Sequence, residues 1–337
     1  MDDVFFYLPE SDDSLANFPQ SVMQYWNWQA QAAGLFPYWG RYHWVLQTWL
    51  YLRDTGVPVQ MVNRLPEEGI IITHMDCVEY GFRPNSSQTL IVMLVDREVP
   101  HPHAHLHITH NPVQHLPFGM PYRYMPPWPQ IGLLPRDGAL GARFEVIGFF
   151  GYAQNLDPAI SDEQFQARMR ALGLRLEVPP PTAWHDFRQV DAILAVRNFG
   201  RNNAHLSKPS LKLFNAWLAG VPAILGHESA YRAEGRPGTG YVEATTAAEL
   251  LDCLEYLRDR PEFRTRVVEF GRTEVRRFAP ERTVQRWQAL LQDSIIPMHR
   301  QPTRSHLDRL KRRLSCSLLE RALWRLPGRF SARDLPI

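Results

Sequence analysis

The amino-acid sequence predicts an α/β protein with two doubly wound domains, each built on a parallel sheet. Short apolar runs alternate with helical segments in two separate blocks of the chain. Between the blocks, residues 111–138 are so rich in proline and aromatic residues that they exclude long helices and interior strands. A length of 337 residues also suits two domains of ordinary size. We therefore expect a first domain over residues 1–125, a linker over 126–140 and a second domain over 141–296.

The first block contains five expected strands and one long helix. The strands are Val4–Leu8, Pro58–Val62, Gly69–Thr73, Thr89–Val95 and Leu106–Thr109. The helix covers residues 39–54, is rich in aromatic side chains, and ends before Gly56. This alternation favours a parallel sheet with helical crossovers.

The second block repeats the alternation. Its expected strands are Arg143–Phe150, Leu174–Val178, Asp191–Val196 and Val221–Leu225. Its expected helices are Asp162–Leu172, a segment from Lys208 to Gly220, Ala247–Arg258, Pro261–Phe278 and Pro280–Leu291.

The segment KPSLKLFNAWLAGVPAILG, residues 208–226, carries an unusual helix. Its leucines and phenylalanine at 211, 214 and 218 have core spacing, whereas Lys208, Lys212 and Asn215 share another face. The two lysines lie in the expected first turns, where free N–H groups and the helix dipole favour an anion. The pattern therefore predicts an anion site at the start of this helix.

Composition restricts the class of protein. Hydrophobic residues make up 45% of the chain and charged residues 21%, as in soluble globular proteins. Cys77, Cys253 and Cys316 lie far apart, which favours a reducing compartment over a disulfide scaffold or zinc ribbon. The acidic N-terminus does not resemble a signal peptide, and no apolar run approaches the ~18 residues that span a bilayer. We expect a cytoplasmic protein.

The C-terminal residues 297–337 form a basic tail. Ten arginines or lysines and three acids lie between Arg300 and the last residue, so this stretch carries +7 and the rest of the chain −5. Within 306–326, leucines recur every three or four residues and draw one apolar stripe along a helix. Two interpretations remain open: a helix packed back on the protein, or a helix lying on an anionic membrane through residues 300–333.

Several candidate ligand-binding residues follow strands of the second block. The carboxyl ends of parallel strands meet at one edge of a sheet, where α/β folds bind ligands. Cations at a strand end and at a helix start suit a diphosphate and neutralise it without a metal ion. The residues are Gly151, Arg197, Lys208, Lys212, Asn215, Glu228 and Ser229.

These motifs resemble a known family. The segment KPSLKLFNAWLAGVPAILG is similar to the donor-site segment of GT-B glycosyltransferases, and KLFNAWLAG is similar to a stretch of α1,3-fucosyltransferases. The phrases HNPVQ, PQIGLLPRD, FFGYAQNL, DAILAVR and ILGHESAYRAE also resemble bacterial, largely cyanobacterial, glycosyltransferases. The resemblance implies two Rossmann-like domains facing across a cleft, a nucleotide-diphosphate sugar as donor, and a glycan, lipid-linked or other hydroxyl acceptor. It implies no separate cofactor and no metal.

The sequence departs from the family at several positions. Many retaining members carry two glutamates eight positions apart, where this chain has Ser207 and Asn215. The fucosyltransferase pattern has a glutamate at the place of Leu211. Lys212 alone carries over cleanly, as a diphosphate ligand, and hydroxyl recognition must use another residue, such as Glu228. The stereochemical outcome stays open.

A transfer with inversion needs a base for the acceptor proton. Asp76, with His74 as its partner, follows an expected strand of the first block and is our first candidate; Asp13 is the second. A retaining reaction needs no such base. The histidine-rich segment HPHAHLHITH lacks the carboxylates or cysteines that would complete a metal site, so we predict that its strand lines the cleft and that some of its histidines contact the acceptor or the linker.

Two other classes of function remain. One is a non-catalytic protein that binds nucleotide sugars or carbohydrates on the same fold. The other is nucleic-acid binding through the tail, which the shortage of interleaved aromatic residues disfavours.

Overall fold

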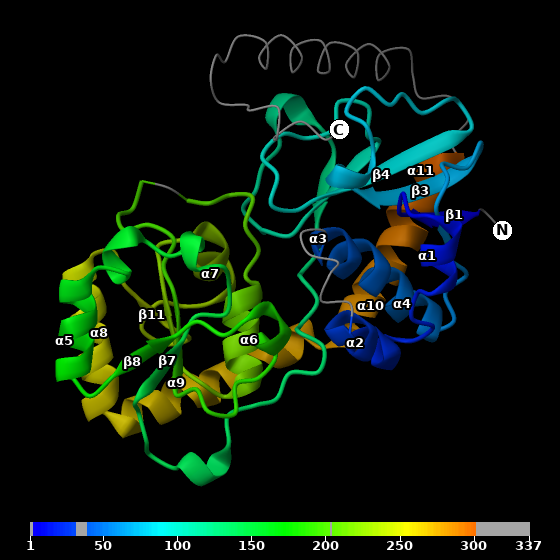
Figure 1. Ribbon diagram of the computed structural model, residues 1–337. Helices are drawn as coiled ribbons and strands as arrows, with labels where there is room; N and C mark the ends of the chain where they lie inside the picture. The colour runs from blue at the N-terminus through cyan, green and yellow to red at the C-terminus, as the bar shows by residue number, and fades with distance from the viewer. Residues whose placement is uncertain (1–2, 32–38, 203, 301–337) are drawn as a thin grey trace. The chain divides into compact units, whose positions relative to one another are not determined.

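The computed structural model describes residues 3–31, 39–202 and 204–300, and the chain divides into two compact units (Figure 1). Of the described residues, unit 1 contains those up to His110, Gln114–Pro126 and residues 280–300. Unit 2 contains Asn111–Val113 and Pro127–Ala279. Each unit is an α/β domain with its own parallel sheet, as the sequence predicts.

Unit 1 is built on a six-stranded parallel sheet in the order β2-β1-β3-β4-β5-β6. The strands are β1 (Val4–Tyr7), β2 (Gln60–Val62), β3 (Gly69–His74), β4 (Gln88–Leu94), β5 (Leu106–Thr109) and β6 (Tyr122–Tyr124). β3 and β4 are buried along their whole length, which explains their continuous apolar sequences. β6 is an edge strand inside the proline-rich segment and was not predicted.

Helices of unit 1 come from both ends of the chain. They are α1 (Asp12–Ala16), α2 (Val22–Gln31), α3 (Trp39–Arg41), α4 (Gln47–Asp54), α10 (Pro280–Leu290) and α11 (Ile296–Arg300). The predicted helix over 39–54 is confirmed, with a π-helical turn at Tyr42–Leu46 between α3 and α4. A second π-helical turn, Leu291–Ile295, joins α10 to α11.

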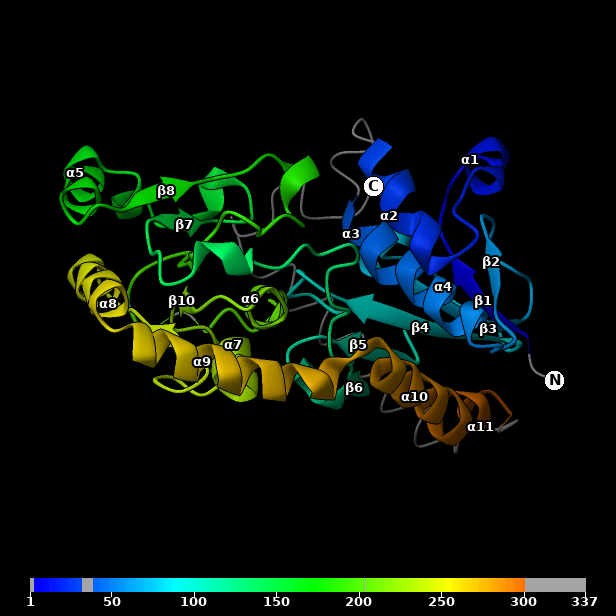
Figure 2. The ribbon, with the colours of Figure 1, turned by 90° about the horizontal axis from the view of Figure 1, so that it is seen from below.

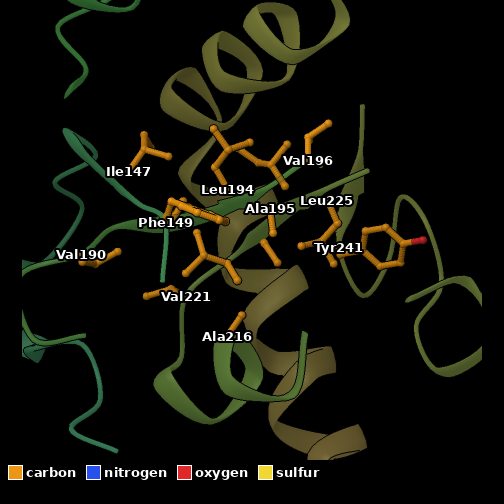
Figure 3. Close-up of a cluster of buried hydrophobic side chains, with 14 of the residues drawn as sticks. Ile147, Phe149, Val190, Leu194, Ala195, Val196, Ala216, Val221, Leu225 and Tyr241 are labelled. Atoms are coloured by element: carbon orange, nitrogen blue, oxygen red, sulfur yellow. The ribbon is translucent and has the colours of Figure 1, made fainter. Parts of the chain in front are cut away.

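Unit 2 has a five-stranded parallel sheet in the order β11-β10-β9-β7-β8. Its strands are β7 (Val146–Gly148), β8 (Arg175–Glu177), β9 (Ala192–Ala195), β10 (Ala223–Leu225) and β11 (Val242–Glu243). Its helices are α5 (Glu163–Ala171), α6 (Leu211–Ala219), α7 (Ser229–Glu234), α8 (Ala247–Asp259) and α9 (Pro261–Glu274). The core joins the sheet to α6 through side chains such as Ile147, Leu194, Ala216 and Leu225 (Figure 3).

Helix α6 differs in detail from its prediction. It begins at Leu211 rather than near Lys208, and it ends as predicted at Gly220, whose φ of 70° is the left-handed conformation that glycine favours. The buried face is formed by Leu213, Phe214 and Trp217. Leu218, predicted to be a core residue, is 37% exposed, because the buried face is centred one residue earlier in each turn.

The C-terminal boundary of the second domain also differs. Sequence analysis placed residues up to 296 in the second domain, but the chain passes from α9 in unit 2 to α10 in unit 1 after Ala279 (Figure 2). α10 packs on α4, and α11 packs on β3 and β4. The Trp287 ring lies 6.5 Å from that of Phe6 on β1. The passage of the chain back to unit 1 depends on contacts between segments that are far apart in the sequence. The local periodicity of a sequence does not predict such contacts.

The predicted linker, residues 126–140, packs on unit 2 over most of its length. Buried Asp191, which precedes β9, holds it in place. Its carboxylate accepts hydrogen bonds from Arg136 and Arg143 and from the backbone N–H groups of Glu145 and Val146.

Within the described ranges, no helix is long and apolar enough to cross a membrane. The predicted tail lies outside the described residues beyond Arg300.

Candidate functional site

The strand order of unit 2 creates a topological switch point between β7 and β9. Parallel sheets with this order bind ligands at the carboxyl ends of the strands beside such a point. Gly151 follows β7 and Arg197 follows β9, so two residues predicted from the sequence flank the switch point. The geometry of the sheet therefore selects the same edge as the sequence pattern.

Phe149 connects the end of β7 to α6. A Cβ atom at Gly151 would lie only 2.8 Å from the Phe149 ring, so any larger residue at 151 would displace that ring. The Lys212 ammonium lies 5.5 Å from the centroid of the same ring, within cation–π range. The buried Phe149 ring is thus a common neighbour of Gly151 and Lys212.

The two lysines lie at the start of α6. Lys212 is in its first turn, whereas Lys208 lies before it in the preceding turn. Ser210, the N-cap residue, is buried and makes no capping bond, and its hydroxyl has no hydrogen-bond partner among the described residues. The first N–H groups of the helix are therefore not capped by a side chain and still favour an anion.

Lysine is rare in this protein. Only three of its 37 basic residues are lysines, and Lys208 and Lys212 are two of them; the third is Lys311. Arginine makes the ion pairs elsewhere in the described structure, whereas lysine offers a compact and flexible point charge. Two of the three lysines of the chain therefore lie at the start of the same helix, which distinguishes this region from the rest of the sequence.

Glu228 follows β10 and lies among these cations. Its side chain is buried, and Arg197 Nε approaches one carboxylate oxygen at 3.3 Å. Burial raises the pKa of Glu228, and the positive charges of Arg197, Lys212 and Lys208 oppose this rise. We call Arg197, Lys208 and Lys212 the cation cradle.

His205 is a further residue near the cradle, because the charges of Arg197 and Lys208 act on it. Burial, followed by the positive charges of Arg197 and Lys208, lowers the pKa of His205 to about 4, so its imidazole is neutral at pH 7. Its φ is 47°, and its Nε2 lies 2.5 Å from Asn198 Oδ1. Sequence reasoning missed His205, because a histidine in an irregular loop carries no periodic pattern.

Two other predicted residues hold the backbone around the cradle. Asn111 Nδ2 donates to Ser229 Oγ at 2.8 Å and to the His205 carbonyl at 3.4 Å. Asn215 is buried, and its Oδ1 accepts a hydrogen bond from the backbone N–H of Gln130 at 3.1 Å. The first contact ties a loop to the start of α7, and the second ties the segment at Gln130 to the middle of α6.

A further polar group lies at the end of β11. Arg232 Nη1 lies 2.8 Å from both carboxylate oxygens of Glu243, and His227 Nδ1 lies 3.1 Å from one of them. Glu243 was not predicted, since it ends a strand of only two residues.

Unit 1 has its own switch point, between β1 and β3. Asp76 follows β3, and Arg97 donates to its two carboxylate oxygens at 2.7 and 2.6 Å. His74 is buried and accepts the Asp76 backbone N–H at 3.2 Å; burial lowers the pKa of His74. The structure brings the two predicted residues together and adds Arg97. The second candidate, Asp13, is exposed in α1 after β1.

Several side chains of the histidine-rich segment form hydrogen bonds within unit 1. His105 Nδ1 accepts the Leu90 backbone N–H, and the two ring nitrogens of His107 lie 3.2 Å from the carbonyl oxygens of Pro121 and His101. His107 is fully buried, which lowers its pKa to about 4. Across the residues described here, no three His, Cys, Asp or Glu side chains are grouped to hold a metal ion.

The residues of the cation cradle lie in a part of the sequence that matches a known family model. Residues 139–292 match the family model described as glycosyl transferase-like. This part of the chain is therefore similar to that family. The match covers the whole second sheet and the cradle, and it confirms the resemblance that the donor-site segment suggested. Two parallel-sheet domains in one chain are also what the GT-B resemblance implied.

Solved glycosyltransferase structures are similar to this chain. Sucrose-phosphate synthase from Thermosynechococcus elongatus is 12% identical over 68% of this chain and 74% of its own, with a TM-score of 0.48. Anabaena HepE in complex with UDP-glucose is 13% identical over 87% of this chain and 100% of its own, also with a TM-score of 0.48. No curated protein matches the sequence.

Proposed function

We propose that the protein is a glycosyltransferase that moves a sugar from a nucleotide-diphosphate sugar to a hydroxyl acceptor. The cation cradle at the switch point of unit 2 carries this proposal, because it lies within the residues that match a glycosyl transferase-like family. Three cations beside an uncapped helix start suit the two phosphates of such a donor. The same groups would stabilise the diphosphate that leaves when the sugar is transferred.

The proposed transfer uses no divalent metal. Arg197, Lys208 and Lys212 supply the charge that a metal ion would otherwise bring to the leaving phosphates. We expect full turnover in excess EDTA. Loss of turnover in EDTA, restored by Mg²⁺ or Mn²⁺, would contradict this part of the proposal.

On the acceptor side, Asp76 is the proposed base, with His74 and Arg97 as its neighbours. Arg97 fixes the orientation of the carboxylate, and the acceptor hydroxyl would compete with it for a carboxylate oxygen. Acceptors of the proposed reaction are glycans, lipid-linked sugars or other hydroxyl compounds.

A panel of UDP-, GDP-, ADP- and TDP-sugars tests the proposal. Thermal shift identifies which donor binds, and nucleotide release with and without added saccharides then measures donor hydrolysis and transfer. A donor that stabilises the protein and is consumed supports a transferase. If no donor of the panel binds, the proposal is wrong.

The alternative is a protein that binds nucleotide sugars without turning them over. Two observations favour it: the family glutamates are replaced by Ser207 and Asn215, and both oxygens of Asp76 are engaged by Arg97. Under this alternative, a donor raises the melting temperature but stays intact through prolonged incubation with every acceptor tested.

A further inference from the structure

Glu228 lies beside the cation cradle and is exceptional there, because a carboxylate occupies the place where we expect a diphosphate to bind. Its side chain is only 2% exposed. Within the described part of the chain, neither of its carboxylate oxygens receives a hydrogen bond of good geometry. Glu228 is also the N-cap residue of α7, yet its side chain caps no N–H group of that helix.

A buried carboxylate without hydrogen bonds is costly, so the neighbouring charges must hold it in place. Arg197 Nε lies 3.3 Å away, and Lys208 and Lys212 are the other cations that act on it. Arg197 in contact with the carboxylate, together with the charges of Lys208 and Lys212, forms an anion site whose anion belongs to the protein itself.

We propose that Glu228 is an internal counter-anion of the cation cradle, which competes with the ligand's phosphates for Arg197, Lys208 and Lys212. The inference rests on the proposed function, since it assumes that these cations bind a diphosphate. In the free protein, the carboxylate relieves the repulsion among three neighbouring cations. In the complex, its charge opposes that of the phosphates and limits their affinity.

Such a competitor has a use in a transferase. The product of sugar transfer is a nucleoside diphosphate, which binds the same cations as the donor and must leave before the next turnover. A cradle without an internal anion would hold this product too tightly, and its release would slow turnover. Glu228 would therefore keep the binding of donor and product weak enough for exchange.

The test is Glu228→Gln, which keeps the shape of the side chain and removes its charge. We expect this variant to bind inorganic pyrophosphate and UDP about ten-fold or more tightly than the wild type, because a negative charge next to the phosphates is lost. Titration calorimetry measures both dissociation constants. Glu234→Gln is the matched control: Glu234 is also a buried glutamate of α7, but its ion-pair partner is Arg277, outside the cradle.

The outcomes are distinct. Weaker or unchanged binding by a folded Glu228→Gln variant would overturn the inference; weaker binding would mean that the carboxylate accepts hydrogen bonds from ligand hydroxyls instead. Glu228→Ala provides a second variant if the first does not fold, with the same expected tightening. If the wild type binds neither pyrophosphate nor any nucleoside diphosphate, the proposed function itself fails.

Discussion

At the scale of single residues, Lys212 is the side chain on which the sequence and the structure agree best. It lies in the first turn of α6, its ammonium is 5.5 Å from the Phe149 ring centroid, and its charge acts on Glu228. We expect Lys212→Ala to weaken the binding of nucleoside diphosphates by ~1.5–3 kcal/mol, the scale of a lost hydrogen bond to a charged group. Titration calorimetry measures this loss, and Lys212→Arg should recover part of it. Unchanged affinity in Lys212→Ala would exclude Lys212 from the site.

The scarcity of lysine allows a direct check of that prediction. Reductive methylation with ¹³C-formaldehyde labels the three lysine side chains and the N-terminal amine, and Lys→Arg variants assign the signals. A nucleoside diphosphate should shift the signals of Lys208 and Lys212 and leave that of Lys311 in place.

Asp76 is the residue to test on the acceptor side. We expect Asp76→Asn to cut the transfer rate by ~10²-fold or more while leaving donor affinity unchanged, since a general base acts on the acceptor and not on the donor. Steady-state transfer kinetics and a separate donor titration distinguish the two effects. Asp13→Asn, at an exposed position of α1, is the comparison. Near-normal turnover in Asp76→Asn would contradict this role of Asp76 and favour either Asp13 as the base or a retaining reaction without a base.

At the scale of elements, Asp191 decides how the segment before β7 packs. Its buried carboxylate joins Arg136 and Arg143 to the backbone of β7, so a single side chain connects three parts of unit 2. We expect Asp191→Asn to lower the free energy of unfolding of unit 2 by ~3–5 kcal/mol, because two partly buried guanidinium groups lose their counter-charge. Urea unfolding measures the loss. Asp186→Asn is the control: its ion pair with Arg188 is largely exposed and contributes about 1 kcal/mol or less.

Much of the element structure was predictable, because apolar runs long enough for buried strands have few alternatives. The strands that overlap segments predicted from such runs are β1, β2, β3, β4, β5, β7, β8, β9 and β10. The strands β6 and β11 were not predicted: β6 lies inside the proline-rich segment, whose composition does not indicate a strand, and β11 has only two residues. The edge of the sheet that carries the site was also predictable, because parallel strands present their carboxyl ends together.

The pairing of side chains within the site was not predictable. Arg97 is 21 positions from Asp76, and Asn111 is 118 positions from Ser229. Contacts of this kind follow from the three-dimensional packing of loops, and loops carry neither the period of a helix nor that of a strand. Likewise, the burial of Glu228 beside Arg197 follows from the packing of separate segments and not from the local sequence.

At the scale of the whole molecule, the two units should respond differently to acid. In the described part of unit 1, burial lowers the pKa of five histidines, His43, His74, His101, His107 and His110, and brings it to between about 3 and about 4 in His43, His101, His107 and His110. An unfolded histidine has a pKa of about 6.5, so the unfolded chain takes up protons first as the pH falls. The stability from these neutral histidines is complete above pH ~6.5 and is lost progressively toward pH ~4.

We therefore expect unit 1 to unfold before unit 2 on mild acidification. In the described part of unit 2, burial lowers the pKa of two histidines, His185 and His205, and both are partly exposed. Hydrogen exchange with mass-spectrometric readout at pH 7.5 and 5.0, corrected for the intrinsic rates, assigns the loss of protection to each unit. Equal loss in both units would contradict the prediction.

The last prediction concerns the binding of the basic tail to an anionic membrane. Residues 301–337 lie outside the described structure, so the prediction rests on their sequence: a leucine stripe over 307–326 and a net charge of +7 from Arg300 onward. On an anionic membrane each basic residue near the surface contributes about 1 kcal/mol, and the leucine stripe adds apolar burial. We expect the full chain to co-sediment with phosphatidylserine vesicles at low salt and to be released as salt rises.

The control for the membrane prediction follows from the fold. Because α11 packs on β3 and β4, a truncation should end after Arg300 and not before Ile296, so that unit 1 keeps this helix. A full-length chain with Arg309, Arg312 and Arg313 replaced by glutamine tests the charge without shortening the protein. Both variants should lose vesicle binding while retaining nucleotide binding at the cation cradle. Equal sedimentation of all three proteins, or none by the full chain, would favour a tail that packs back on the protein.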